Sequence, residues 1–177
     1  RDQLLCLAKD PAVKVRRKLV DRLSCGRFQH GTTTNREVVA LLSHDRKASI
    51  RASIVHDWRL PVSRIKEMLN DPSSKVRLAI ASDLRFPQEV YASLVLDQDA
   101  DVRGVACERL LRFGYDWGRQ NAMLCIHELS GLRRKVDELA KDLMPLVNDP
   151  EVTIRLLLAM NQNTPARVLG KLVDDDS

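Results

Sequence analysis

The stretch Asp71-Pro-Ser-Ser-Lys-Val-Arg-Leu-Ala-Ile-Ala-Ser-Asp-Leu-Arg-Phe-Pro87 decides the fold, because its pattern recurs along the chain. Five times an Asp is followed, six residues later, by an Arg that has Val or Ile directly before it. The Asp positions 45, 71 and 97 lie 26 residues apart, and Asp149 lies two such periods after Asp97. A Pro follows sixteen residues after the Asp in three of these units. Self-similarity of this period is typical of proteins built by stacking identical structural units.

Each repeat predicts two short helices. The first begins just after the Asp, which we expect to be its N-cap, with Pro at the first helical position in three repeats. Its apolar residues fall five, nine and ten positions after the Asp, on one face of a helix. The second helix opens at the repeat Pro, and helices this short depend on stacking against neighbours. The sequence therefore predicts an all-α solenoid of short helix pairs. Four residues are predicted to be buried between them: Ile80, Leu94, Leu158 and Leu172.

The repeated Asp and Arg define what we call the Asp–Arg ladder. A fixed period places each Asp beside the Arg of its own or an adjacent repeat, so caps and ion pairs should follow one another along one edge. An Arg held by a carboxylate serves structure, and only the ends of such a ladder offer charges to a ligand. The predicted ladder residues are Asp10, Arg16, Asp45, Arg51, Asp71, Arg77, Asp97, Arg103, Asp149 and Arg155.

The composition fits one domain spanning residues 1–177. Hydrophobic residues make up 44% and aromatic residues 4%, so the core must be aliphatic. The apolar runs are too short to span a bilayer, and no secretory signal is recognisable, so we expect a cytoplasmic protein without membrane contact. The start at Arg1, and the acidic residues 174–176 where another repeat would begin, suggest a piece of a longer protein.

The net charge of +5 is unevenly distributed. Residues 1–36 hold nine Lys and Arg against three Asp, whereas residues 142–177 hold six acids against three bases. A basic end can meet an anionic partner, although charge on such a fold is usually only solvated surface. The candidate anion-binding or partner-binding residues are Arg16, Arg17, Lys18, Arg22, Arg27, Arg59 and Arg85.

The units from Asp45 to Asp97, and residues 161–175, resemble the leucine-rich repeat variant family. The shared features are the Asp, the Val-Arg, a turn like Asn161-Gln-Asn, the Pro and the closing Leu pattern. The Asp and Val-Arg spacing is also similar to that of HEAT and armadillo-like repeats. This resemblance implies a right-handed superhelix of short helices. Family members can carry a Cys-rich iron–sulfur segment, and this sequence has no such segment, so we expect no cofactor.

Two irregular units interrupt the period, at residues 24–36 and 113–148. The first is rich in Gly, Thr and Asn and predicts a loop. In the second, Gly114-Tyr-Asp-Trp-Gly118 predicts a turn before further helix, and Pro145 should kink or end that helix.

No set of residues in the sequence indicates catalysis, so we expect a non-enzymatic scaffold for another protein. The four His are scattered, no Cys-x-x-Cys pair suggests a metal site, and no glycine-rich phosphate loop occurs. The alternative is a nucleic-acid-binding HEAT-like protein, remotely an alkylpurine DNA glycosylase, for which Asp57-Trp58 and Asp116-Trp117 offer a faint likeness. Trp58 shares its repeat position with Leu23, Leu84 and Leu110, which favours packing between turns.

Overall fold

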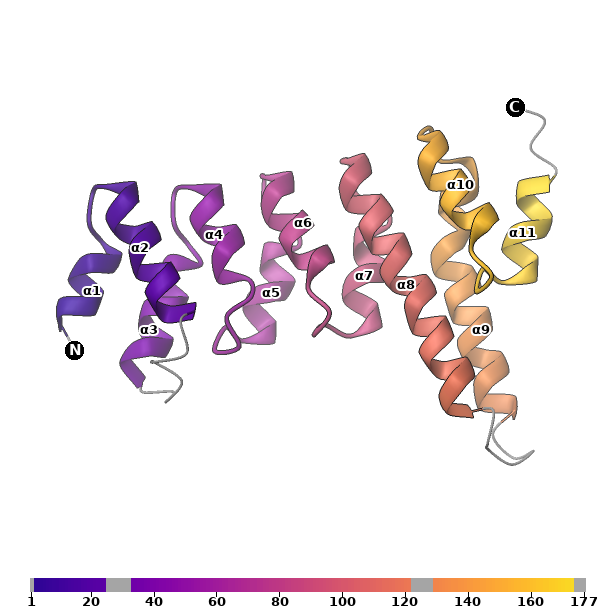
Figure 1. Cartoon of the computed structure of the whole chain (residues 1–177), viewed down its shortest axis with the longest axis horizontal. Coiled ribbons are helices and arrows are strands. Elements are labelled where there is room, and N and C mark those ends of the chain that lie inside the picture. Colours follow the sequence, from indigo (N-terminus) through magenta and orange to yellow (C-terminus); the bar gives the residue numbers. More distant parts are fainter. Residues whose placement is uncertain (1, 25–32, 122–128, 174–177) are drawn as a thin grey trace. The chain divides into compact units, whose positions relative to one another are not determined.

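The computed structural model describes residues 2–24, 33–121 and 129–173, with side chains within 3–24, 35–112 and 136–173. Over these residues the protein is all-helical, and no strand occurs in the described ranges (Figure 1). The chain divides into two compact units, Arg1–Asp83 and Leu84–Ser177. In the part of the chain that the structure describes, no helix is long and apolar enough to cross a membrane.

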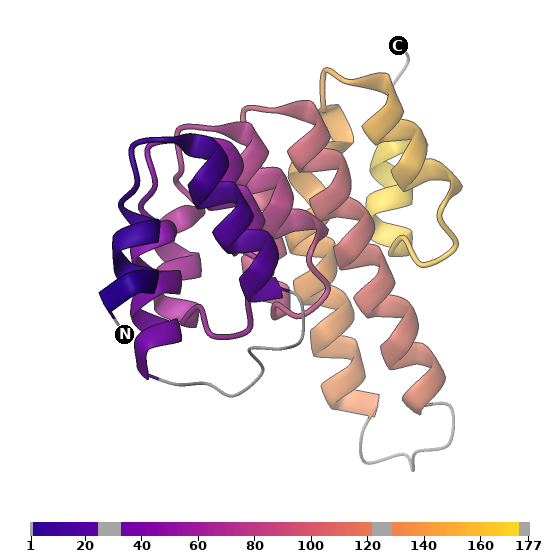
Figure 2. The same cartoon turned by 60° about the vertical axis from the view of Figure 1, so that its left-hand side comes forward.

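The N-terminal unit consists of two layers of short helices. The helices that follow the ladder Asp form one layer, in which α4 contacts both α2 and α6. The helices of the second layer lie behind them, and Figure 2 shows the same two layers from another side. The bounds are α1 (Asp2–Ala8), α2 (Val13–Ser24), α3 (Thr33–Leu42), α4 (Ala48–Ile54), α5 (Val62–Met68) and α6 (Ser74–Ser82).

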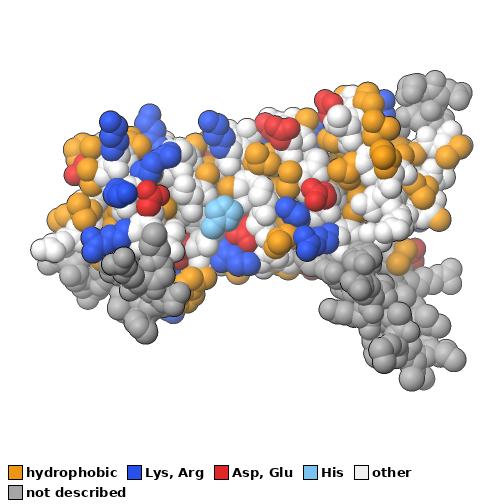
Figure 3. Space-filling model, viewed as in Figure 1, with side chains coloured by type: hydrophobic (Ala, Val, Ile, Leu, Met, Phe, Trp, Pro, Cys, Tyr) orange, Lys and Arg blue, Asp and Glu red, His pale blue; other side chains and the backbone are white. Residues whose placement is uncertain are grey.

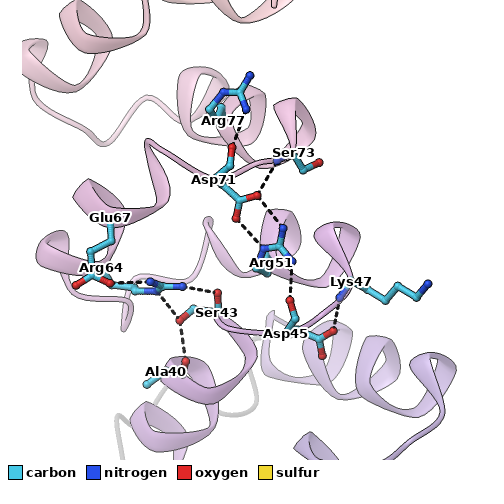
Figure 4. Close-up of polar contacts among 10 residues, drawn as sticks. All are labelled: Ala40, Ser43, Asp45, Lys47, Arg51, Arg64, Glu67, Asp71, Ser73 and Arg77. Atoms are coloured by element: carbon cyan, nitrogen blue, oxygen red, sulfur yellow. Dashed lines mark hydrogen bonds and ion pairs between the residues drawn. The ribbon is translucent and has the colours of Figure 1, made fainter. Parts of the chain in front are cut away.

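A hydrogen-bonded arginine joins the second layer to the first repeat turn. Arg64 of α5 donates to the carbonyl and hydroxyl oxygens of Ser43, at 2.9 and 3.1 Å, and to Glu67 at 2.6 Å (Figure 4). Ser43 itself donates to the Ala40 carbonyl at 2.7 Å. These bonds tie the start of α5 to the end of α3, two helices too short to be stable alone.

The C-terminal unit contains the longest helices of the chain. It consists of α7 (Gln88–Leu94), α8 (Ala100–Asn121), α9 (Leu129–Leu143), the 3-10 helix η2 (Met144–Asn148), α10 (Val152–Met160) and α11 (Ala166–Val173). Helices α8 and α9 run antiparallel side by side in both views (Figures 1 and 2), and α8 also contacts α7 and α10. Pro145 lies at the start of η2, and α9 ends just before it, as the sequence predicts.

The predicted turn at residues 114–118 is wrong, because α8 continues through both glycines to Asn121. A glycine inside a helix costs about 1 kcal/mol relative to alanine. Packing against the amphipathic α9 is the tertiary contact that offsets this cost, since α8 and α9 touch along their length. Sequence propensity indicated a turn at this point, and the partner helix decided otherwise.

The core follows the repeat positions that the sequence predicts. The residues nine positions after each ladder Asp are all buried: Leu19, Ile54, Ile80, Ala106 and Leu158. Burial of Ile80, Leu94 and Leu158 is therefore confirmed, whereas Leu172 of α11 is only half-buried. Leu172 lies on the last helix of the array, where the structure places no further helix against its outer side.

Candidate functional site

The guanidinium groups of the ladder bind the backbone of their own repeat. In all five repeats Nη1 of the Arg donates to the carbonyl oxygen of the Asp six residues earlier, at 2.6 to 3.0 Å. Because this bond lies within one repeat, it fixes the Arg side chain over the turn that precedes its own helix.

The same arginines reach forward to the next repeat. Nε and Nη2 of Arg51 donate to the two carboxylate oxygens of Asp71, both at 2.7 Å, while Nη1 holds the Asp45 carbonyl (Figure 4). Arg16 forms the same two-pronged pair with Asp45, and Arg103 with Asp149. Two parallel bonds between charged groups combine strength with fixed geometry. Each of these arginines therefore connects two successive repeats.

The ladder Asp is not the helix N-cap, contrary to the sequence prediction. Its carboxylate accepts the backbone N–H two residues on, at 2.8 to 2.9 Å in all five repeats, and so closes an Asx turn. The N-cap positions of α4, α6 and α10 are Lys47, Ser73 and Glu151, which make no side-chain capping bond. The Asp is displaced from the cap because its second oxygen must face the incoming arginine.

Burial and hydrogen bonding oppose each other at these carboxylates. For Asp45 and Asp71, burial favours the neutral form, but the arginine hydrogen bond and the backbone N–H together hold the pKa below its ordinary value. The pKa of Asp149 is lowered first by the Arg103 hydrogen bond. The same pairs raise the pKa of Arg16, Arg51 and Arg103. The ladder is thus charged and internally neutralised.

Acid should weaken the protein through these three carboxylates. A group with a lowered folded pKa contributes stability that is complete above its unfolded pKa and is lost as pH falls through the folded one. We therefore expect the contribution of the ladder to the free energy of unfolding to be level from about pH 5 upward and to fall below about pH 5. Urea titrations between pH 3 and 7 measure this. Asp71→Asn should flatten the acid loss, and an unchanged slope would show that the ladder does not carry it.

The candidate anion-binding residues do not act as one group. Arg16 and Arg59 are buried and held by carboxylates, whereas Arg17, Lys18, Arg22 and Arg85 are exposed. The Arg85 guanidinium lies 5.8 Å from the centre of the Phe86 ring. Arg27 lies outside the described residues. Within those residues, only the exposed members of the set remain accessible to a ligand.

The turn between α4 and α5 is held by a second, buried ion pair. Asp57 accepts the Arg59 backbone N–H at 2.9 Å, and its carboxylate also accepts Nε of Arg59 at 2.8 Å and Nη2 at 2.5 Å. Nη2 also donates to the Leu23 carbonyl at 3.2 Å, which anchors the turn to the end of α2. The turn backbone is therefore fixed on both sides of residue 58.

Trp58, at the tip of this turn, is 58% exposed, so the expectation that it packs between turns is wrong. The reason lies in where the helix ends. In the repeats of Leu23 and Leu110 the first helix continues through this position and turns the side chain inward, whereas α4 ends at Ile54. Leu84, in the equivalent turn after α6, is exposed as well.

His56 is the second exposed side chain of this turn. Its Nδ1 lies 3.0 Å from a carboxylate oxygen of the buried Asp83, while over half of the side chain remains exposed. The Arg59 guanidinium lies 5.9 Å from the centre of the Trp58 ring, within reach of a cation–π contact. We call His56, Asp57, Trp58, Arg59 and Asp83 the turn cluster: a rigid, ion-paired base that presents an aromatic and an imidazole ring.

Other chemistry finds little support in the described part of the chain. No group of three or more His, Cys, Asp or Glu there is arranged to hold a metal ion. Cys107 is buried, and burial raises the pKa of its thiol to about 12, so it behaves as a small core residue. Asp116 and Trp117, the second half of the glycosylase likeness, lie where the structure does not describe side chains.

Comparisons with known proteins add no relative. A scan against protein-family models, a search of curated proteins and a search of solved structures each found no match.

Proposed function

We propose that this chain is a non-enzymatic helical-repeat scaffold that binds another protein, with Trp58 as the anchor of the interface. We further propose that its repeats form a right-handed superhelical solenoid of the HEAT and armadillo-like kind. The observation that carries the binding role is the exposed Trp58 ring on a turn fixed by a buried ion pair.

A rigid exposed tryptophan is costly to leave in water and inexpensive to bury. Trp and Arg dominate the binding energy of protein interfaces, and a side chain ordered in advance loses little entropy on binding. The Asp57–Arg59 pair supplies that order, because it fixes the backbone on both sides of Trp58. The ladder arginines do not compete for this role, since they serve the connections between repeats.

Truncating this anchor tests the proposal. The immobilised chain is used to capture proteins from a lysate, and the affinity of a captured protein is then measured with purified components. Trp58→Ala should weaken it about 30-fold, which corresponds to about 2 kcal/mol. The matched control is Leu84→Ala, the equivalent and similarly exposed turn position, which should bind as the parent does. Equal binding by both variants would remove Trp58 from the interface.

Nucleic-acid binding is the second candidate, favoured by three exposed bases on one helix, Lys14, Arg17 and Lys18 of α2. Figure 3 shows Lys and Arg side chains over the N-terminal unit, interspersed with acidic and neutral ones. Binding through phosphates would be indifferent to sequence and would weaken by orders of magnitude between about 50 and 200 mM salt. Gel shifts with duplex DNA discriminate the two candidates, because a scaffold anchored on Trp58 forms no such complex at micromolar concentration.

A further inference from the structure

The outer face of α10 carries an uncovered apolar stripe. Val152, Leu156 and Met160 are 53%, 51% and 82% exposed, and their spacing of four places them on one side of the helix. Ala159 is exposed beside them. Figure 3 shows hydrophobic side chains gathered over α10, in contrast to the mixed surface of the N-terminal unit. Repeat proteins need a polar outer face at their terminal repeats to stay soluble, and α10 does not have one.

The contact between α8 and α10 shows what covers this face elsewhere. A Cβ added to Gly104, seven residues after its ladder Asp, would lie 3.9 Å from Cγ1 of Ile154, five residues after the next one. Position seven of one repeat thus faces position five of the following repeat. Leu156 holds position seven in the last repeat. At position ten, Val20, Val55, Ala81 and Cys107 are at most 2% exposed, and only Ala159 is uncovered.

The first repeat shows the complementary vacancy. At position five, Ile50, Val76, Val102 and Ile154 are at most 2% exposed, whereas Val15 of α2 is only half-buried. The carboxylates of Asp45, Asp71 and Asp149 each accept two bonds from the arginine of the preceding repeat. Among the described residues, the Asp10 carboxylate accepts only the N–H of Ala12. The incoming face of α2 therefore has the chemistry of a repeat that receives a neighbour.

We propose that the α10 stripe of one copy receives the α2 face of a second copy, so that the chain assembles head to tail. The contact continues the repeat-to-repeat packing of α8 on α10, with Leu156 of one copy against Val15 of the next. Charge favours this pairing, because the sequence carries a net +6 over residues 1–36 and a net −3 over residues 142–177. It also opposes the symmetric alternative, in which two tails of like charge would meet.

The geometry of this contact predicts growth rather than a closed dimer. A head-to-tail contact leaves a free head and a free tail after every addition, so assembly continues unless a ring closes. Sedimentation equilibrium at moderate salt should therefore give a weight-average mass that rises with concentration beyond two chains. A constant monomer mass up to about millimolar concentration, where even weak contacts form, overturns the proposal.

Two variants, each lacking one face, provide the decisive test. Leu156→Glu removes the tail and Val15→Glu removes the head, so each should sediment as a monomer. An equimolar mixture should form a complex of two chains and no larger one, because one intact head and one intact tail remain. Self-association of Val15→Glu alone would indicate tail-to-tail contact and contradict the proposal.

Further variants guard against loss of folding. Met160→Glu, at a side chain too exposed to support the core, should weaken assembly at least tenfold without changing the circular dichroism spectrum. Unchanged assembly of Met160→Glu overturns the assignment of the stripe. Trp58→Ala should leave assembly intact, so failure here and failure of the proposed protein-binding role appear in different measurements.

Discussion

Arg16→Ala should lower the free energy of unfolding by about 3–5 kcal/mol, the cost of removing one partner of a buried ion pair. Arg16 and Asp45 are both almost fully buried. The guanidinium also donates to the carbonyls of Asp10 and Pro11, at 2.7 and 3.1 Å. The substitution leaves a buried carboxylate whose main remaining donor is the Lys47 N–H. In a chain of this length we expect the melting temperature to fall by about 6–20 °C.

The neighbouring Arg17 provides the control for this substitution. It is exposed on the same helix, so Arg17→Ala should change the free energy of unfolding by less than about 0.5 kcal/mol. Both variants lose one positive charge, and a difference between them therefore measures the ladder rather than net charge. Equal effects in thermal and urea denaturation would show that the Arg16–Asp45 pair does not connect the repeats.

Leu158→Ala should cost about 2–5 kcal/mol, because this side chain is fully buried in α10 and its loss leaves a cavity. Leu156, two residues earlier on the same helix, is half exposed, so Leu156→Ala should cost well under 1 kcal/mol. The two substitutions are chemically identical and differ only in helix face. Urea denaturation at low protein concentration, where self-association is absent, measures both.

A reversed order of these two effects would mean that the face of α10 is assigned wrongly. Similar effects would instead indicate that α10 is covered on both sides under the conditions of the measurement. Dilution distinguishes the two cases, because only cover by another copy depends on protein concentration.

The hydrophobic period was sufficient to predict the core, because burial repeats with the helix. The positions five and nine after the ladder Asp predict the inner faces of α4, α6 and α10. The six-residue spacing of Asp and Arg likewise predicted a structural role for both. It left open which Asp each Arg meets, because a sequence period fixes distances along the chain but not the side on which the next unit stacks.

The turn cluster could not be predicted, since it depends on where each helix stops. Trp58, Leu23 and Leu110 share one repeat position, yet two are buried and one is exposed. The signal that was available is the local pairing of Asp57 with Arg59, an Asx turn that competes with helix continuation. At Gly114 the opposite happened: a local turn preference gave way to the partner helix α9.

The ladder pairs also separate the length of a repeat from its register. Arg51 and Asp71 are 20 residues apart in sequence, Arg16 and Asp45 are 29 apart, and Arg103 and Asp149 are 46 apart, yet the bond geometry is the same. Loop-closure entropy grows slowly, by only about 0.6 kcal/mol for each doubling of the enclosed segment. A clamp of this kind therefore tolerates sequence gained or lost between its two residues. The α8–α9 hairpin is the place where this chain has lengthened without shifting the next repeat, and grafted segments should be accepted there for the same reason.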